Sequence, residues 1–351
     1  MKFLISSYTG LGNFILKTPM IRAILEHFPN AQIDLICGSP WGAEKVLENS
    51  RWINQIHWCK PKSSIFKKIS LFFDIRAENY DVLLCPFDST PRFLRIFVCF
   101  LGIKKIISHL YFNKNKNLRN SLTLLFRPVI TFVPILTGRH ESDLNLDLLE
   151  PLLEKPTDRD LQTFVNWEHE NLPFKLPESF IIIQLGACNG APTPKTWDPK
   201  NFIEIINRWR KDHPENKFVL VGDQGDAKIL ESVEIPVNGV LNLLGKTTFN
   251  QLCNVLNQAE LVIAHDSGVM HLANALQKPL IALYGPTDYS RTAPLFINSH
   301  MIHSRNECWA KMYNFNESES NLAKHYKDYH CMSGISCQDV LTTIKSILKN
   351  G

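Results

Sequence analysis

The chain has 351 residues, of which 44% are hydrophobic and 21% are charged, and its formal net charge is +4. This length suits two domains of roughly 150 residues each, and the lack of an apolar run of about 18 residues excludes a typical membrane-spanning helix. The nine scattered cysteines favour reduced thiols over a disulfide framework, and the apolar part of the N-terminus is too short for a signal peptide.

Positive charge is concentrated in the first half of the chain. Residues 1–150 contain 19 Lys and Arg against 12 Asp and Glu, whereas the remainder contains 19 against 22. A basic first half is suited to a phosphorylated acceptor or an anionic membrane surface, but it is also compatible with ordinary solvated lysines. The basic residues form no motif with interleaved aromatics, so we do not expect a nucleic-acid partner.

The first half alternates between strand and helix patterns. The expected elements are strands over residues 3–6, 33–37 and 82–85 and helices over residues 13–28 and 93–101. Residues 121–136 are apolar but are interrupted by Arg127, Pro128 and Pro134. They fit a buried loop and helix or, less commonly, an exposed patch for a lipid-linked substrate.

The second half repeats the same alternation after a segment rich in proline and charge over residues 155–178. Strands are expected over residues 180–185, 218–221, 240–243, 261–264 and 280–283, and helices over residues 201–213, 226–233, 248–259 and 338–349. The pattern predicts an α/β fold of two Rossmann-like domains whose parallel sheets face a central cleft. We place the first domain at residues 1–160, the linker at 161–178 and the second domain at 179–351.

Residues 262–288 carry the most informative motif. Asp266 and Ser267 follow a buried strand at the start of a helix, and Gly268 permits close approach of a ligand. Ligands of open α/β sheets bind at the carboxyl ends of the strands, and free amides at a helix start suit phosphate. Lys195, in the loop after strand 180–185, is directed to the same edge, where a lysine can neutralise a diphosphate.

Each of these residues also has an ordinary structural interpretation. Lys195 alone fits a solvated loop lysine, Asp266 alone fits a helix N-cap, and His271 alone fits a packed or capping histidine. Only their combination is specific. The earlier turn GLGNFI has Ile15 where a dinucleotide fingerprint requires a third glycine, so that function is weakly supported. Its glycines serve either a tight turn or the approach of a substrate.

The segment HDSGVMHLANALQKPLIALYGPTD resembles the signature of glycosyltransferase family 9, the lipopolysaccharide heptosyltransferases, which have the GT-B arrangement of two Rossmann-like domains. Further similar blocks are GLGNFILKTPM at the start, HESDLNLDLLEPL at 140–152, KTWDPKNFIEII at 195–206, the run at 243–268 and CMSGISCQDVLTTI at 331–344. The blocks occur in the family's order over nearly the whole chain.

The resemblance implies an inverting transfer of a heptose-like sugar from ADP-heptose, or a similar nucleotide sugar, to a lipopolysaccharide core or another phosphorylated glycan or glycolipid. The site residues that it implies share one donor pocket, namely Gly12, Lys195, Asp266, Ser267, Gly268, His271, Tyr284, Gly285, Pro286 and Thr287. Lys195 and the helix start would stabilise the departing ADP, so no cofactor is obligatory and Mg²⁺ is not required. The enzyme would be cytoplasmic, with peripheral contact at the inner membrane.

Asn13 departs from the family pattern, because the family has Asp, the presumed base, at this position. A neutral amide can orient a hydroxyl but cannot remove its proton. Either Asp88 or Glu141 serves as the base, or activity is low, or the acceptor differs, or Asn13 is only a helix N-cap. The alternatives for the whole chain are therefore a catalytically impaired nucleotide-sugar-binding homologue and, with less support, a GT-B epimerase.

The last group of interest is formed by Cys308, Cys331 and Cys337. Some relatives carry an iron-binding cysteine cluster, but these residues lack CxxC spacing and an evident fourth ligand. We expect them to be structural and expect no metal site.

Overall fold

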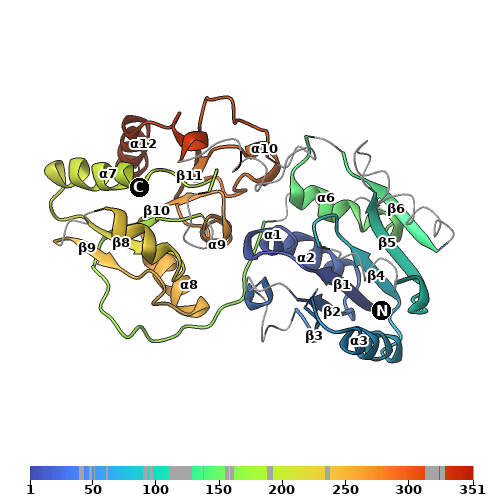
Figure 1. Cartoon of the computed structure of the whole chain (residues 1–351). Helices are drawn as coiled ribbons and strands as arrows, with labels where there is room; N and C mark the ends of the chain where they lie inside the picture. The colour runs from blue at the N-terminus through green and yellow to red at the C-terminus, as the bar shows by residue number, and fades with distance from the viewer. Residues whose placement is uncertain are drawn as a thin grey trace. The chain divides into compact units, whose positions relative to one another are not determined.

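The computed structural model divides the chain into two compact units, Met1–Asn166 and Trp167–Gly351 (Figure 1). The boundary falls within the segment that we predict as the linker. The model describes residues 1–38, 43–46, 50, 52–60, 62–89, 94, 98–110, 129–136, 138–154, 158, 162–187, 193–233, 238–312, 324 and 329–350. No helix in these ranges is long and apolar enough to cross a lipid bilayer.

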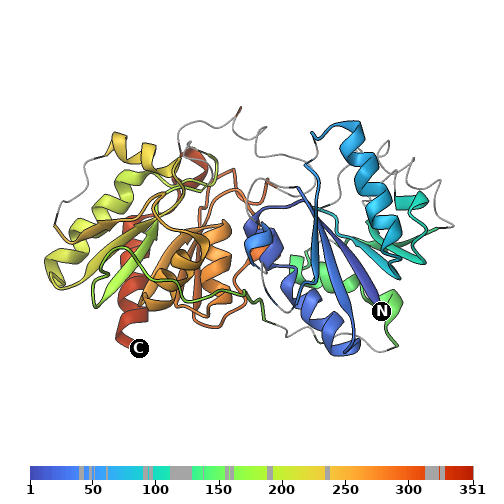
Figure 2. The same cartoon turned by 90° about the horizontal axis from the view of Figure 1, so that it is seen from below.

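The first unit is built on a parallel sheet with the strand order β3-β2-β1-β4-β5-β6. Its strands are β1 (Lys2–Ser7), β2 (Gln32–Cys37), β3 (Gln55–Trp58), β4 (Val82–Cys85), β5 (Lys105–Leu110) and β6 (Ile130–Pro134). Its helices are α1 (Leu11–Ile15), α2 (Thr18–His27), α3 (Ile65–Ala77) and α6 (Glu141–Asp147), with short 3-10 turns at Ala43–Val46, Val98–Phe100 and Glu150–Leu152. Figure 2 shows α2 and α3 on opposite faces of this sheet.

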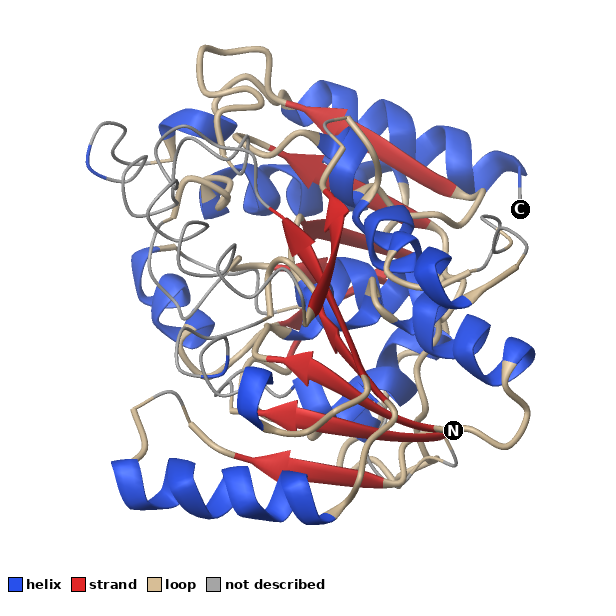
Figure 3. Ribbon diagram, turned by 90° about the vertical axis from the view of Figure 1, so that its right-hand side faces the viewer, coloured by secondary structure: helices blue, strands red, loops and turns tan. Residues whose placement is uncertain are grey.

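The second unit has a parallel sheet with the order β12-β11-β10-β7-β8-β9. Its strands are β7 (Phe180–Gln184), β8 (Lys217–Val221), β9 (Val240–Asn242), β10 (Leu261–His265), β11 (Leu280–Tyr284) and β12 (Ser299–His303). Its helices are α7 (Pro199–Asp212), α8 (Phe249–Gln258), α9 (Gly268–Ala275), α10 (Tyr289–Thr292) and α12 (Cys337–Asn350), with 3-10 helices at Asp226–Ser232 and His330–Met332. Figure 3 shows the strands of the sheets flanked by helices.

Both sheets have Rossmann topology, because the first strand of each unit lies at the centre and the order reverses beside it. The reversal lies between β1 and β4 in the first unit and between β7 and β10 in the second. The central strands are buried over their whole length, for example FIIIQ in β7 and LVIAH in β10. Continuous apolar runs are typical of parallel strands that are covered on both faces. The reversal point is where such sheets bind ligands, at the carboxyl ends of the strands.

Several sequence predictions need correction. The single helix expected over residues 13–28 is two helices, since Pro19 has no N–H to donate to the Ile15 carbonyl and the Thr18 hydroxyl donates to it instead, at 2.7 Å. The α-helix expected over residues 226–233 is a 3-10 helix at Asp226–Ser232. Over residues 121–136, the described part contains the edge strand β6, and Pro134 is its last residue, a position where a strand tolerates proline. Residues 121–128 lie outside the described ranges. Of the helix expected over residues 93–101, residues 93 and 95–97 also lie outside them, and Val98–Phe100 form a 3-10 turn.

Candidate active site

An ion pair lies at the reversal point of the second unit. The loop after β7 carries Lys195, and β10 ends immediately before Asp266. The Lys195 ammonium lies 2.8 Å from Asp266 Oδ2 and also donates to the Asp266 carbonyl oxygen at 3.3 Å. Only 15% of the Lys195 side chain and 5% of the Asp266 side chain are exposed. The structure therefore brings together two residues that the sequence places 71 positions apart.

The surroundings of Asp266 keep its carboxyl group ionised. Burial by itself would raise the pKa of Asp266, but Lys195 and then His271 outweigh it and hold the pKa below the usual range. His271 Nε2 lies 3.9 Å from Asp266 Oδ1, and the Thr292 hydroxyl donates to the same oxygen at 3.3 Å. Asp266 is therefore a buried carboxylate that holds the Lys195 ammonium at the sheet edge.

The start of α9 lies next to this pair. Ser267 is the N-cap residue in an extended conformation, but its side chain makes no capping bond. Instead, the Ser267 hydroxyl donates to Gln184 Oε1 at 2.7 Å and thereby connects the ends of β10 and β7. The amides that begin at Gly268 carry the partial positive charge of a helix start. Together with Lys195 they make this edge suitable for an anionic group such as a diphosphate.

The segment 284–287 packs beneath the site rather than at its surface. The Tyr284 side chain is fully buried, and its hydroxyl donates to the Thr292 carbonyl at 3.0 Å. A Cβ atom at Gly285 would collide with Met332 Sδ and lie 3.1 Å from the Cys331 carbonyl oxygen, so a side chain here would require Met332 to move. The Pro286 carbonyl accepts from Met312 N at 2.9 Å, and Thr287 is 1% exposed. The role of these residues in donor binding stays a prediction.

A second buried ion pair lies at the reversal point of the first unit. Lys17 of the α1–α2 connection donates to Asp88, which follows β4, at 2.6 Å. The same Asp88 Oδ2 accepts from Asn13 Nδ2 at 3.2 Å and from the Thr9 hydroxyl at 3.1 Å, while Oδ1 accepts from the Ser89 hydroxyl at 2.8 Å. The Lys17 side chain is 1% exposed and that of Asp88 is 12% exposed. Asn13 therefore donates to a carboxylate within its own unit.

This arrangement restricts the possible roles of Asn13 and Asp88. Asn13 lies inside α1, whose N-cap is Gly10, so the N-cap interpretation of Asn13 is wrong. Burial would raise the pKa of Asp88, but Lys17 and the surrounding donors hold it below its usual range. A carboxylate with a lowered pKa is ionised but is a weak base.

The other two predicted residues of the first unit are buried. Glu141 lies in the first turn of α6, and Gly12 lies in α1. Gly12 therefore belongs to a different unit from the other predicted donor-binding residues.

The comparison with known proteins places the chain in a family. Residues 99–322 match the model of glycosyltransferase family 9 (heptosyltransferase). The chain belongs to glycosyltransferase family 9. The predicted family and the predicted enzyme class, a glycosyltransferase, are thereby confirmed.

Two kinds of relative agree with this assignment. Lipooligosaccharide heptosyltransferase 2 of Campylobacter jejuni is 26% identical and aligns over 100% of this chain and 99% of its own length. Among solved structures, ADP-heptose lps heptosyltransferase II of Escherichia coli has a TM-score of 0.70 at 18% identity, covering 100% and 99% of the two chains. Escherichia coli heptosyltransferase WaaC with ADP also has a TM-score of 0.70, at 15% identity and 99% and 100% coverage. The predicted GT-B fold is confirmed.

In this family 9 chain, a disulfide supports the loop beneath the site. Cys308 and Cys331 are joined, so the expectation of reduced thiols is wrong for this pair. The bond fixes the segment that ends at Met312 to the turn containing Met332, and these two residues contact Pro286 and Gly285. Cys337 has a free thiol. Within the described ranges, no group of three or more His, Cys, Asp or Glu side chains is arranged to hold a metal ion.

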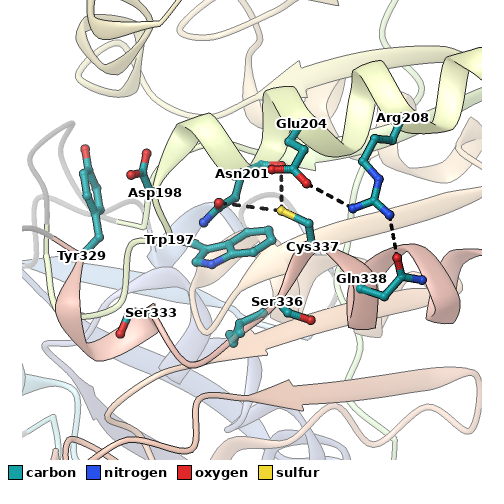
Figure 4. A pocket seen from close by; sticks show the side chains of 11 residues that line it. Trp197, Asp198, Asn201, Glu204, Arg208, Tyr329, Ser333, Ser336, Cys337 and Gln338 are labelled. Atoms are coloured by element: carbon teal, nitrogen blue, oxygen red, sulfur yellow. Dashed lines mark hydrogen bonds and ion pairs between the residues drawn. The ribbon is translucent and has the colours of Figure 1, made fainter.

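A pocket of 470 Å³ lies between the starts of α7 and α12 (Figure 4). Cys337 donates to the Asn201 carbonyl at 3.6 Å, and burial raises the pKa of its thiol to about 11. Arg208 of α7 donates to Glu204 of the same helix at 3.1 Å and to Gln338 of α12 at 2.6 Å, and the second bond links the two helices. None of the predicted site residues is among the described residues that line this pocket. The pocket is therefore separate from the Lys195–Asp266 pair.

His265 positions the loop that carries Lys195. Its Nε2 accepts a hydrogen bond from the Trp197 backbone N–H at 3.0 Å, so the ring is neutral in the fold. Burial lowers the pKa of His265 to about 4, compared with about 6.5 for an unfolded histidine. Between these values the unfolded chain binds the extra proton, and stability is lost as the pH falls.

We therefore expect the free energy of unfolding to decrease as the pH falls from about 6.5 to about 4. Urea unfolding at several pH values measures this dependence. The variant His265→Gln should lose less stability over that interval than the wild type. His300→Gln is the control, because His300 is exposed, and it should keep the wild-type dependence. Equal dependence in wild type and His265→Gln would contradict the assignment of this titration to His265.

Proposed function

We propose that this chain is an inverting glycosyltransferase that moves a heptose-like sugar from ADP-heptose to the core of a lipopolysaccharide or lipooligosaccharide. The observation that carries the proposal is the Lys195–Asp266 ion pair beside the start of α9, at the reversal point of the sheet. The names of the relatives support the donor and the acceptor class. We assign donor binding to the second unit and acceptor binding to the first.

The chemistry follows from where negative charge develops. ADP gains charge as its bond to the anomeric carbon breaks, and a cation and helix amides placed at the diphosphate stabilise that charge. In the proposal, Lys195 contacts phosphate, and Ser267 and Gly268 present amides to it. Asp266 holds Lys195 in place, with His271 beside it. This arrangement supplies the positive charge from the protein itself, so Mg²⁺ is not required.

The acceptor hydroxyl must lose a proton as the new bond forms, and this step separates two candidate functions. Asn13 stands where the family resemblance places the base, and its amide donates to Asp88. Asp88 is in turn held by Lys17, which weakens it as a base. These contacts favour a second candidate, a nucleotide-sugar-binding homologue with little transfer activity.

A transfer assay distinguishes the candidates. The chain is incubated with ADP-heptose and a heptose-bearing core glycolipid, with ADP-glucose as the control donor. The gain of one heptose is measured by mass spectrometry, and the anomeric configuration of the product by NMR. The proposal predicts transfer with inversion. Heptose isomerisation without acceptor would instead identify an epimerase, and failure to bind ADP-heptose in calorimetry would contradict both candidates.

If ADP-heptose binds without transfer, the second candidate is favoured and Asn13→Asp becomes decisive. A carboxylate beside Asp88 places two like charges about 3 Å apart, which raises the pKa of one of them and creates a base. We then expect transfer to rise by ~10²-fold or more. Asn13→Ala is the matched control, because it removes the amide without supplying a carboxylate, and it should give no such gain.

A further inference from the structure

Helix α3 of the first unit presents an apolar stripe to solvent. The stripe consists of Ile65, Phe66, Ile69 and Phe73, which are 56%, 81%, 40% and 61% exposed. Spacings of three, four and seven residues place these side chains on one face of the helix. Single exposed apolar residues are common, but a contiguous apolar face on the surface marks an interaction site.

The stripe is distinct from the side of α3 that stabilises the fold. Leu71 and Ile75 are 7% and 1% exposed and pack against Leu4, Ile36 and Leu83 of the sheet. The core-facing side of the helix is therefore already satisfied. The outward position of α3 on its sheet can be followed in Figure 2. The only ring contact between the stripe and this side, within the described residues, is that of Phe73 with Phe72 at 5.5 Å, and all four stripe residues stay 40% or more exposed. The apolar character of the stripe therefore calls for a partner outside the unit.

The charge around the stripe identifies the kind of partner. Lys60, Lys62 and Lys67 are exposed near the N-terminal end of α3, and the first turn contains no acidic residue. Lysines at this end oppose the helix dipole, so their placement costs stability and concentrates positive charge. The acidic Asp74 and Glu78 lie at or beyond the other end. An apolar face with lysines beside it is the composition of a helix that lies in the headgroup region of an anionic bilayer.

Two further exposed rings belong to segments that precede α3 in the chain or hydrogen-bond to it. Trp58, at the end of β3, is 45% exposed and precedes Lys60 and Lys62 in the chain. Phe100 is 57% exposed, and its carbonyl accepts a hydrogen bond from Arg76 at 2.9 Å, which holds it near the C-terminal end of α3. Tryptophan and phenylalanine with a basic flank are typical of membrane-interface contacts.

We propose that α3 docks the first unit onto a bilayer that carries anionic headgroups, with the apolar stripe inserted among the lipids and the lysines against the headgroups. The docking adds a surface to the proposed function without depending on it, because vesicle binding is measured without donor or acceptor. A transferase that acts on a lipid-anchored glycan would gain proximity to its acceptor in this way.

Vesicle cosedimentation tests the proposal with the full chain. We expect binding to vesicles of phosphatidylglycerol mixed with phosphatidylcholine, weak binding to phosphatidylcholine alone, and weaker binding as salt is raised. Phe66→Ser combined with Phe73→Ser should reduce binding about tenfold or more. Lys62→Glu combined with Lys67→Glu should reduce binding only to the anionic vesicles. Ile297→Ser, at an 89% exposed position in the second unit, is the control and should bind as the wild type does.

Three results would overturn the docking proposal. The first is that the wild type does not bind anionic vesicles, and the second is that the Phe66/Phe73 variant binds them as well as the wild type does. The third is that the wild type is a dimer in light scattering, does not bind vesicles, and becomes a monomer in the Phe66/Phe73 variant. The last result would identify the stripe as a self-association surface. The thermal midpoint of the double variant should stay close to that of the wild type, because both rings are more than half exposed and the variant removes a single ring contact, that of Phe73 with Phe72. Transfer to a soluble, delipidated acceptor should also be unchanged, which separates failure of docking from failure of the proposed function.

Discussion

Lys195→Ala is expected to lower the rate of heptosyl transfer by ~10²- to 10³-fold. The proposal gives the Lys195 ammonium the task of stabilising charge that appears on ADP only as its bond to the sugar breaks. An interaction made in the transition state lowers kcat, whereas one made equally with the bound donor raises KM. We therefore expect the loss mainly in kcat, measured by coupled ADP release at saturating ADP-heptose.

The control for this experiment is Lys200→Ala, at an exposed position five residues further along the chain, which should keep the wild-type rate. Lys195→Ala also removes the cation nearest to Asp266, so its folding is checked by thermal unfolding with and without ADP. Lys195→Arg retains a positive charge and should retain more activity than Lys195→Ala. Wild-type kcat in a folded Lys195→Ala protein would rule out the role that we propose for Lys195.

The strands and several helix ends could be predicted from local sequence. Phe180–Gln184 (FIIIQ) and Leu280–Tyr284 (LIALY) are short, largely apolar runs, the first with three β-branched isoleucines, which sets them apart from their polar flanks. Asp198 before Pro199 predicts the start of α7, and its side chain indeed accepts from Lys200 N. In each case the information lies within a few residues of the element that it determines.

The elements that the sequence did not predict are stabilised by distant contacts. β3 is a four-residue edge strand, QIHW, whose polar and apolar residues alternate over too short a stretch to identify it from sequence. The apolar residues of α3 lie on both its sides, so they give no single hydrophobic face. The pairing of Cys308 with Cys331 depends on the fold, because sequence does not determine disulfide connectivity.

The candidate site could be predicted only in part for the same reason. Asp266 to Gly268 follow directly from a strand–helix junction, whereas no local sequence signal marks Lys17. Its importance depends on β1 pairing with β4, which brings Asp88 next to the connection between α1 and α2. Each unit therefore has a buried lysine–aspartate ion pair at the point where its strand order reverses.

Asp88→Asn is expected to destabilise the first unit by ~3–5 kcal/mol, because it leaves the Lys17 ammonium buried without a counter-charge. Lys17 is 1% exposed, and besides Asp88 it donates to the Asn13 carbonyl at 3.0 Å, which is a neutral partner. Urea unfolding measures the change in the free energy of unfolding. Lys104→Ala is the control, since the Lys104–Asp81 pair is exposed at the lysine and is expected to contribute about 1 kcal/mol or less.

The double variant Lys17→Met with Asp88→Asn shows whether the loss comes from the unpaired charge. Removing both charges should recover a large part of the stability that Asp88→Asn loses, because a buried ion pair replaced by uncharged groups is often close to neutral. Equal losses in the single and double variants would instead attribute the effect to the hydrogen bonds from Thr9, Asn13 and Ser89. Wild-type stability of Asp88→Asn would show that the pair does not stabilise the fold, leaving Lys17 buried for another reason, such as a contact with the acceptor.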